Sequence, residues 1–128
     1  MGLIEHSTNA ISERTIGAAI EVHRHLGPGL LESSYLACLC HELQLRGIAY
    51  QSQVALALEY KGIRVARSYV IDLLIEDVLI IEVKAVDRLL PIHSAQLLTY
   101  MRLRGVYSGL LINFNIDTLC LGIKRHLR

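Results

Sequence analysis

Residues 68–86 read SYVIDLLIEDVLIIEVKAV, two apolar runs that are joined at Glu76-Asp77. The second run, Val78–Val83, is apolar enough to predict a strand that is buried on both faces. Alternate residues of a strand point the same way, so Glu82 and Lys84 share one face of it. Charges in such runs need a physical reason, because an unpaired buried charge is costly or is neutralised by a proton.

Two explanations of these charges remain open from the residues alone. In the first, Lys84 forms a salt bridge with an acid and Asp72 lies near a strand end in water; charge placement alone favours this one. In the second, Asp72, Glu82 and Lys84 converge on a divalent metal ion. Two carboxylates supply hard oxygen ligands for Mg²⁺, and an adjacent ammonium group can position a water or a phosphate oxygen.

The turn between the two runs decides whether the carboxylates can meet. Opposed residues of an antiparallel hairpin share a face, so Asp72 faces Glu82 if the turn is a three-residue loop over residues 76–78. A two-residue turn at Glu76-Asp77 would pair Asp72 with Ile81 and place the carboxylates on opposite faces. Glu-Asp lacks the Asn-Gly signal of a tight turn, so the longer loop is at least as well supported.

The composition predicts one globular domain over residues 1–128. The chain is 52% hydrophobic and 20% charged, which argues against disorder, and its apolar stretches are too short for a membrane-spanning helix. A net charge of +1 is not the basic footprint of strong nucleic-acid binders, so nucleic-acid binding has to rest on a local site. The high hydrophobic fraction favours a homodimer. Three cysteines without framework spacing favour a cytoplasmic protein.

Two helices are expected before the strands. After a loose lead-in over residues 1–7, apolar spacing predicts a helix from Thr8 or Asn9 to His25. His23 and His25 are expected to be solvated or to cap that helix. A turn at Gly27-Pro28-Gly29 leads to a second helix over Leu31–Arg46. Glu32 lies in its first turn, where it either complements the helix dipole or takes part in a metal site.

The rest of the chain predicts a sheet interrupted by one helix. Strands at Tyr50–Tyr60, Ile63–Ile75 and Val78–Ala85 form an antiparallel meander, and the helix Pro91–Arg104 follows. Strands at Tyr107–Asn113 and Thr118–Ile123 close the fold, ahead of a solvated basic tail. The order α-α-β-β-β-α-β-β predicts an α/β fold with a mixed β-sheet flanked by helices on both faces.

The last helix carries His93, Gln96 and Tyr100 on one face, at spacings of i, i+3 and i+7. One interpretation is a polar stripe that faces solvent. In the other, Gln96 and Tyr100 face the strand with Glu82 and Lys84 and bind water or a phosphate.

The chain resembles the PD-(D/E)XK nuclease superfamily in its Asp72, its Glu82-Val83-Lys84 and the following helix that bears Gln96. It is more similar to one branch, the small bacterial GxxExxY family, because residues 29–35 read GLLESSY. Residues 89–100, LLPIHSAQLLTY, and residues 109–114, GLLINF, also resemble that family. The resemblance covers roughly Thr8 to Ile123.

The resemblance implies a restriction-endonuclease-like core with a metal-dependent phosphodiesterase site. Asp72, Glu82 and the Val83 carbonyl would bind Mg²⁺ or Mn²⁺, and Glu32 would be a further ligand or would orient the attacking water. Lys84 would lower the pKa of that water and offset transition-state charge, and Gln96 would hold Lys84 or the water. Tyr35, His93 and Tyr100 are the expected substrate contacts.

Two functions follow from these observations. The first is a metal-dependent nuclease that acts on DNA or RNA, helped by dimerisation or by a partner. The second is a non-catalytic binding or assembly module, in which the acids and Lys84 form a sealed ionic network and an apolar surface binds a partner. Carboxylates that can share one ion in a cleft open to solvent would favour the nuclease.

Overall fold

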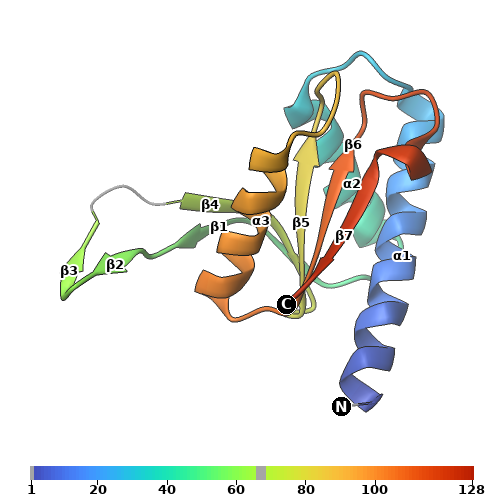
Figure 1. Cartoon of the computed structure of the whole chain (residues 1–128). Coiled ribbons are helices and arrows are strands. Elements are labelled where there is room, and N and C mark those ends of the chain that lie inside the picture. Colours follow the sequence, from blue (N-terminus) through green and yellow to red (C-terminus); the bar gives the residue numbers. More distant parts are fainter. Residues whose placement is uncertain (1, 66–68) are drawn as a thin grey trace.

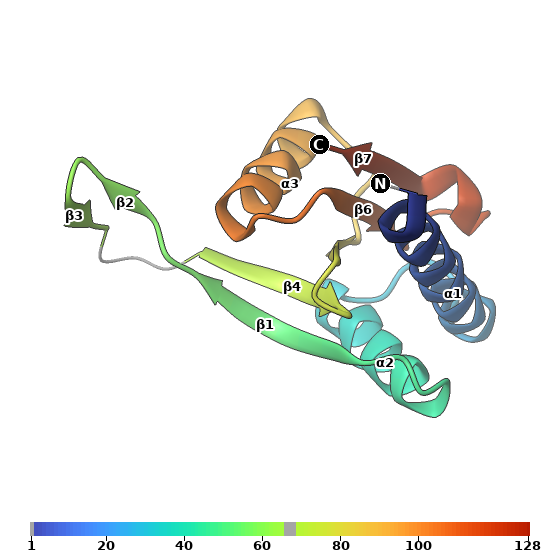
Figure 2. The same cartoon turned by 90° about the horizontal axis from the view of Figure 1, so that it is seen from below.

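A five-stranded mixed sheet, in the order β1-β4-β5-β6-β7, forms the centre of the protein (Figure 1). The computed structural model describes residues 2–65 and 69–128, and the side chains from Thr8 onward. Residues 66–68 of the predicted second strand therefore lie outside the described part, as do the side chains of residues 2–7. Helices α1 and α2 cover one face of the sheet and α3 covers the other, as the view from below makes clear (Figure 2). The predicted α/β class, with helices on both faces of a mixed sheet, is confirmed.

The predicted succession of two helices, strands, a helix and two further strands is confirmed, but five strands precede α3 where three were predicted, and several boundaries differ. The elements are α1 Gly2–Leu26, α2 Glu32–Leu45, β1 Tyr50–Leu56, β2 Glu59–Tyr60, β3 Ile63–Arg64, β4 Tyr69–Ile75, β5 Leu79–Lys84, α3 Pro91–Arg104, β6 Ser108–Asn113, a short 3₁₀ helix η1 Leu119–Gly122 and β7 Ile123–Leu127.

The two predicted strands before β5 are each broken into two. Strand β1 pairs with β4, whereas β2 and β3 form a separate small hairpin that projects away from the body (Figures 1 and 2). The hairpin turns at Lys61 and Gly62, as predicted, and both have the positive φ of a tight primed turn. We call residues 57–65 the arm.

Two predictions at the ends of the chain are wrong. Helix α1 begins at Gly2, not at Thr8 or Asn9, because polar residues that can cap a helix are also tolerated inside one. The last strand is β7, Ile123–Leu127, so most of the predicted basic tail lies in the sheet. β7 is an edge strand, paired only with β6 among the described strands, and an edge accepts charged side chains.

Strand β5 is buried on both faces, as predicted. Its Leu79, Ile81 and Val83 pack in the cluster beneath α1 and α2, and Ile80 packs in the cluster beneath α3. The alternation therefore turns Glu82 toward the α3 face. None of the helices in the described residues is long and apolar enough to cross a membrane.

Gly109 lets α3 lie close to the sheet. A Cβ atom there would be 2.9 Å from Leu97 Cδ1 and 2.9 Å from Met101 Sδ. We expect Gly109→Ala to lower the free energy of unfolding by about 1–3 kcal/mol, because Leu97 and Met101 are fully buried and their side-chain ends have little room to move away from the added methyl group. Urea denaturation followed by circular dichroism measures this change.

Gly17→Ala is the matched control. Gly17 lies inside α1 without a positive φ, and the nearest atom to its added Cβ is the flexible guanidinium end of Arg46, at 3.2 Å. Alanine favours a helix over glycine by about 1 kcal/mol, so this variant should be neutral or more stable. Equal destabilisation by the two substitutions would contradict the close packing of α3.

Candidate active site

Strands β4 and β5 separate at the place where the acidic residues lie. Their pairing runs through Ile75–Leu79 and Leu74–Ile80 to Leu73–Ile81. The loop therefore spans the three residues 76–78, and the next step of the same register would place Asp72 opposite Glu82. Of the two turns that the sequence left open, the structure has the longer one. Beyond this point β4 stays paired with β1 and β5 with β6, and Figure 1 shows β1 and β4 turning away from β5. We call this divergence the fork.

The two carboxylates replace the missing backbone partners at the fork. The Asp72 N–H donates to Glu82 Oε2 at 2.9 Å, and the Val83 N–H donates to Asp72 Oδ2 at 2.8 Å. These bonds satisfy N–H groups that would otherwise be left unpaired between separating strands. They also fix both carboxylates side by side, because each one is held by the strand that carries the other.

Both acids are poorly solvated. Glu82 is 4% exposed, and burial, followed by the nearby charge of Asp72, raises its pKa to about 8. Burial also raises the pKa of the half-buried Asp72, although the hydrogen bond from Val83 opposes this change. The pair therefore holds a proton near neutral pH unless a cation neutralises it.

Lys84 and Glu32 lie beside this pair. The charge of Lys84 lowers the pKa of both acids and that of Glu32 raises it, in each case after the larger effect of burial. Lys84 is half-buried and forms no ion pair with an acid in the part of the chain that is described. Glu32 is exposed, and its Oε1 accepts a hydrogen bond from the Ala85 N–H at 3.2 Å. The sealed network of the module hypothesis is therefore not formed.

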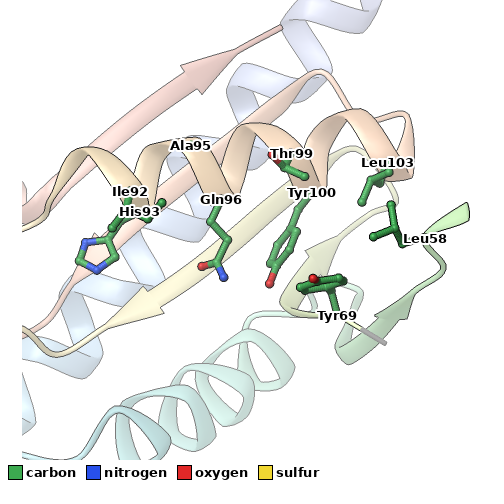
Figure 3. A pocket seen from close by; sticks show the side chains of 9 residues that line it. All are labelled: Leu58, Tyr69, Ile92, His93, Ala95, Gln96, Thr99, Tyr100 and Leu103. Carbon is green, nitrogen blue, oxygen red and sulfur yellow. The ribbon is translucent and has the colours of Figure 1, made fainter. Parts of the chain in front are cut away.

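A cleft lies between α3 and the root of the arm. Its volume is about 420 Å³, and Figure 3 shows Gln96 and Tyr100 pointing from α3 toward the strands. Gln96 is exposed and Tyr100 is 5% exposed. Tyr100 thus packs against the sheet, whereas Gln96 lies in the solvent-accessible part of the cleft, so this face is not a purely solvent-facing stripe. We call this cavity the α3 cleft; its lining is Leu58, Tyr69, Ile92, His93, Ala95, Gln96, Thr99, Tyr100 and Leu103.

His93 has a structural task at the start of α3. Its Nδ1 accepts a hydrogen bond from the Leu90 N–H at 2.9 Å, which caps the helix. The ring also lines the α3 cleft, so only its second nitrogen is left for the expected substrate contact.

The prediction that Tyr35 contacts the substrate is wrong. Tyr35 is fully buried and stacks on Phe114, with 4.7 Å between the ring centroids. Its hydroxyl donates to the Gly27 carbonyl and accepts from the Leu30 N–H at 3.1 Å. Tyr35 therefore holds the turn that leads into α2, and with it the position of Glu32.

Sequence reasoning missed three residues. Asn113 is 2% exposed, and its amide accepts from the Val86 N–H and donates to the Val86 carbonyl, which holds the loop after β5. His23, expected to be solvated or to cap its helix, is buried, and its Nε2 lies 2.7 Å from the Ile116 carbonyl. Tyr69 lines the α3 cleft. Of these three, only Asn113 could have been found from the sequence, because a polar residue at the end of an apolar strand indicates a specific hydrogen-bonding role.

The donor set at the fork fits a hard divalent cation. Asp72 and Glu82 each use one oxygen for a backbone N–H and keep the second oxygen for another ligand. No three His, Cys, Asp or Glu side chains gather closely enough within the described residues to form a complete metal cage. Mg²⁺ does not need one, because it is usually held by one or two carboxylates, with water and substrate oxygens completing its shell.

The chain was also compared with known proteins. A family model described as the PD-(D/E)XK nuclease superfamily matches residues 9–126. The comparisons with curated proteins and with solved structures gave no significant match. The family match contains β1 to β6, all of β7 except its last residue, and all residues of the fork.

The raised pKa of Glu82 predicts how stability depends on pH. Between pH 4.5, the ordinary pKa of a glutamate, and about 8, the folded protein keeps a proton that the unfolded chain releases. In metal-free buffer the free energy of unfolding should therefore fall by about 2–4 kcal/mol as the pH rises through this window. Chemical denaturation at a series of pH values measures the decline.

Glu82→Gln is the control for this effect. Its amide oxygen can still accept the Asp72 N–H, but the side chain no longer titrates. We expect the decline to become shallower in this variant. An equally steep decline would place the responsible group elsewhere in the protein.

Proposed function

The chain belongs to the PD-(D/E)XK nuclease superfamily, and on this premise we propose that it hydrolyses phosphodiester bonds of nucleic acid with the help of Mg²⁺ or Mn²⁺. The fork is the observation that carries the proposal. It holds two carboxylates side by side and, among the described residues, leaves one oxygen of each without a backbone partner and forms no ion pair between either acid and Lys84.

Asp72 and Glu82 are the proposed metal ligands, and the Val83 carbonyl is the proposed third. The Lys84 carbonyl accepts from the Phe114 N–H, on the β6 side, so the alternation of the strand turns the Val83 carbonyl toward the fork. The bound ion would supply Lewis-acid stabilisation of phosphate charge and would lower the pKa of its water. Everything else in the reaction is assigned to side chains of this chain.

Lys84 is proposed to position the attacking water and to offset negative charge that develops on the phosphate. Its side chain is free for this task, because the described residues give it no acidic partner within ion-pair distance. Glu32 would accept a proton from the water or orient it, and the Ala85 N–H fixes its position. Gln96, from α3, would hold the water or Lys84.

The module hypothesis is the second candidate, and it requires Lys84 to be paired with both acids. That pairing is the feature that the fork lacks, so the nuclease is favoured. Membership of the GxxExxY branch, a homodimer and a cytoplasmic location stay predictions. The dimer would be sought first on the arm, where Tyr60 and Ile63 oppose each other and are 59% and 62% exposed.

A cleavage assay with end-labelled DNA and RNA tests the proposal. We expect activity with Mg²⁺ or Mn²⁺ that disappears on chelation, and we expect Lys84→Ala to reduce the rate by about 100-fold or more. Lys124→Ala is the matched control, because Lys124 is an exposed lysine on the edge strand β7, two strands away from β5.

The outcomes separate the two functions. Loss of cleavage in Lys84→Ala, with Lys124→Ala unchanged and both variants folded, supports the nuclease. Absence of cleavage of any single- or double-stranded substrate, with either ion, would leave the binding module as the better account.

A further inference from the structure

The α3 cleft has a chemistry that differs from that of a groove for duplex nucleic acid. None of the nine described residues that line it is a lysine or an arginine. Contacts to the phosphates of any nucleic acid, single- or double-stranded, depend on such cations, so the cleft itself does not have the chemistry of a phosphate site. The cleft therefore suits an uncharged, flat and mainly apolar group. Its volume of about 420 Å³ falls in the usual range for small-molecule sites, roughly 300–1,000 Å³.

Two tyrosines shape one end of the cleft. The centroids of Tyr69 and Tyr100 are 6.4 Å apart, and the rings are tilted by 53°. Tyr69 is 41% exposed, whereas Tyr100 is 5% exposed, so Tyr69 offers the free ring and Tyr100 forms part of the wall. Figure 3 shows the two rings approaching each other from β4 and α3. Aromatic faces of this kind stack on nucleobases of any sequence.

Polar groups stand beside the aromatic wall. Gln96 and Thr99 line the cleft from α3, and Figure 3 shows the Gln96 amide on the side toward the strands. An amide and a hydroxyl can bond to the edge of a base whose Watson–Crick face is free. A base paired in a duplex does not present that edge.

The cleft adjoins the fork. Tyr100 packs in the cluster that contains Ile71 and Ile80. Ile71 directly precedes Asp72, and Ile80 lies two residues before Glu82 on the same face of β5. After the larger effect of burial, the charges of Glu82 and then Asp72 raise the pKa of Tyr100. A nucleotide in the cleft would thus have its phosphate close to the carboxylates.

We propose that the α3 cleft receives an unstacked nucleobase of single-stranded nucleic acid, stacked on Tyr69, and that the protein prefers single strands to duplexes. This inference rests on the proposed nuclease function and names its substrate class. DNA and RNA share the recognised group, so both are tested.

The test uses the full chain and short oligonucleotides that contain the fluorescent base 2-aminopurine, as single strands and as duplexes of the same sequence. Ca²⁺ replaces Mg²⁺, and gels verify that the strands stay intact. We expect the wild-type protein to quench the single strand by stacking and to bind it more tightly than the duplex. Tyr69→Ala should weaken that binding by about 5- to 150-fold, whereas Tyr69→Phe, which keeps the ring, should bind as the wild type does.

Tyr107→Ala is the matched control, because Tyr107 lies between α3 and β6, outside the cleft, and is also exposed. It should leave the quenching unchanged, and thermal melts establish that each variant is folded. If Tyr69→Ala does not fold, Tyr69→Leu replaces it, since leucine fills the space without a stacking face. Equal or tighter binding of the duplex, or no change in the folded variant, overturns the inference. So does occupation of the cleft by an apolar peptide that neither DNA nor RNA displaces.

Failure of this inference can be told apart from failure of the proposed function. Metal-dependent cleavage of duplexes alone would keep the nuclease and remove the single-strand preference. Quenching that depends on Tyr69, without cleavage under any condition, would keep the base site and remove the catalytic role.

Discussion

The exchange of hydrogen bonds between Asp72 and the Glu82–Val83 segment is the interaction on which the rest of the site depends. It allows β4 and β5 to separate without leaving buried N–H groups unpaired. The separation then gives β4 a course along β1 toward the arm and opens the α3 cleft beside the acids. The side chains of Asp72 and Glu82 thus bond the backbone N–H groups where the pairing of β4 and β5 stops, and they also supply the negative charge of the site.

This solution has a cost. Glu82 is 4% exposed and lies next to Asp72, so its pKa is raised to about 8. At neutral pH it therefore keeps a proton that a solvated glutamate would lose. A structural role alone would not need it, because a buried ion pair with Lys84 could neutralise the acids. Lys84 instead remains unpaired within the described residues, so the fork is left with a charge that a divalent cation can balance.

The sequence predicts those features that depend on neighbouring residues. The apolar run of β5 and the boundaries of α3 at Pro91 and Gly105 follow from local chemistry. The three-residue loop was one of two turns that the residues left open. Long-range contacts could not be predicted in this way. Tyr35 has the spacing of a motif residue, but stacking on Phe114 buries it. Charges in β7 suggested a solvated tail, because sequence does not reveal that a strand lies at the edge of a sheet.

Isothermal titration calorimetry with Mg²⁺ and Mn²⁺ tests the central claim, that the fork is a metal site, most directly. The account predicts that the wild-type protein binds the ion, that Asp72→Ala with Glu82→Ala abolishes binding, and that Glu59→Ala, on the exposed arm, leaves it unchanged. Unaltered binding in the double variant would place the metal elsewhere. No binding by the wild type at millimolar metal, even with an oligonucleotide present, would contradict the claim outright.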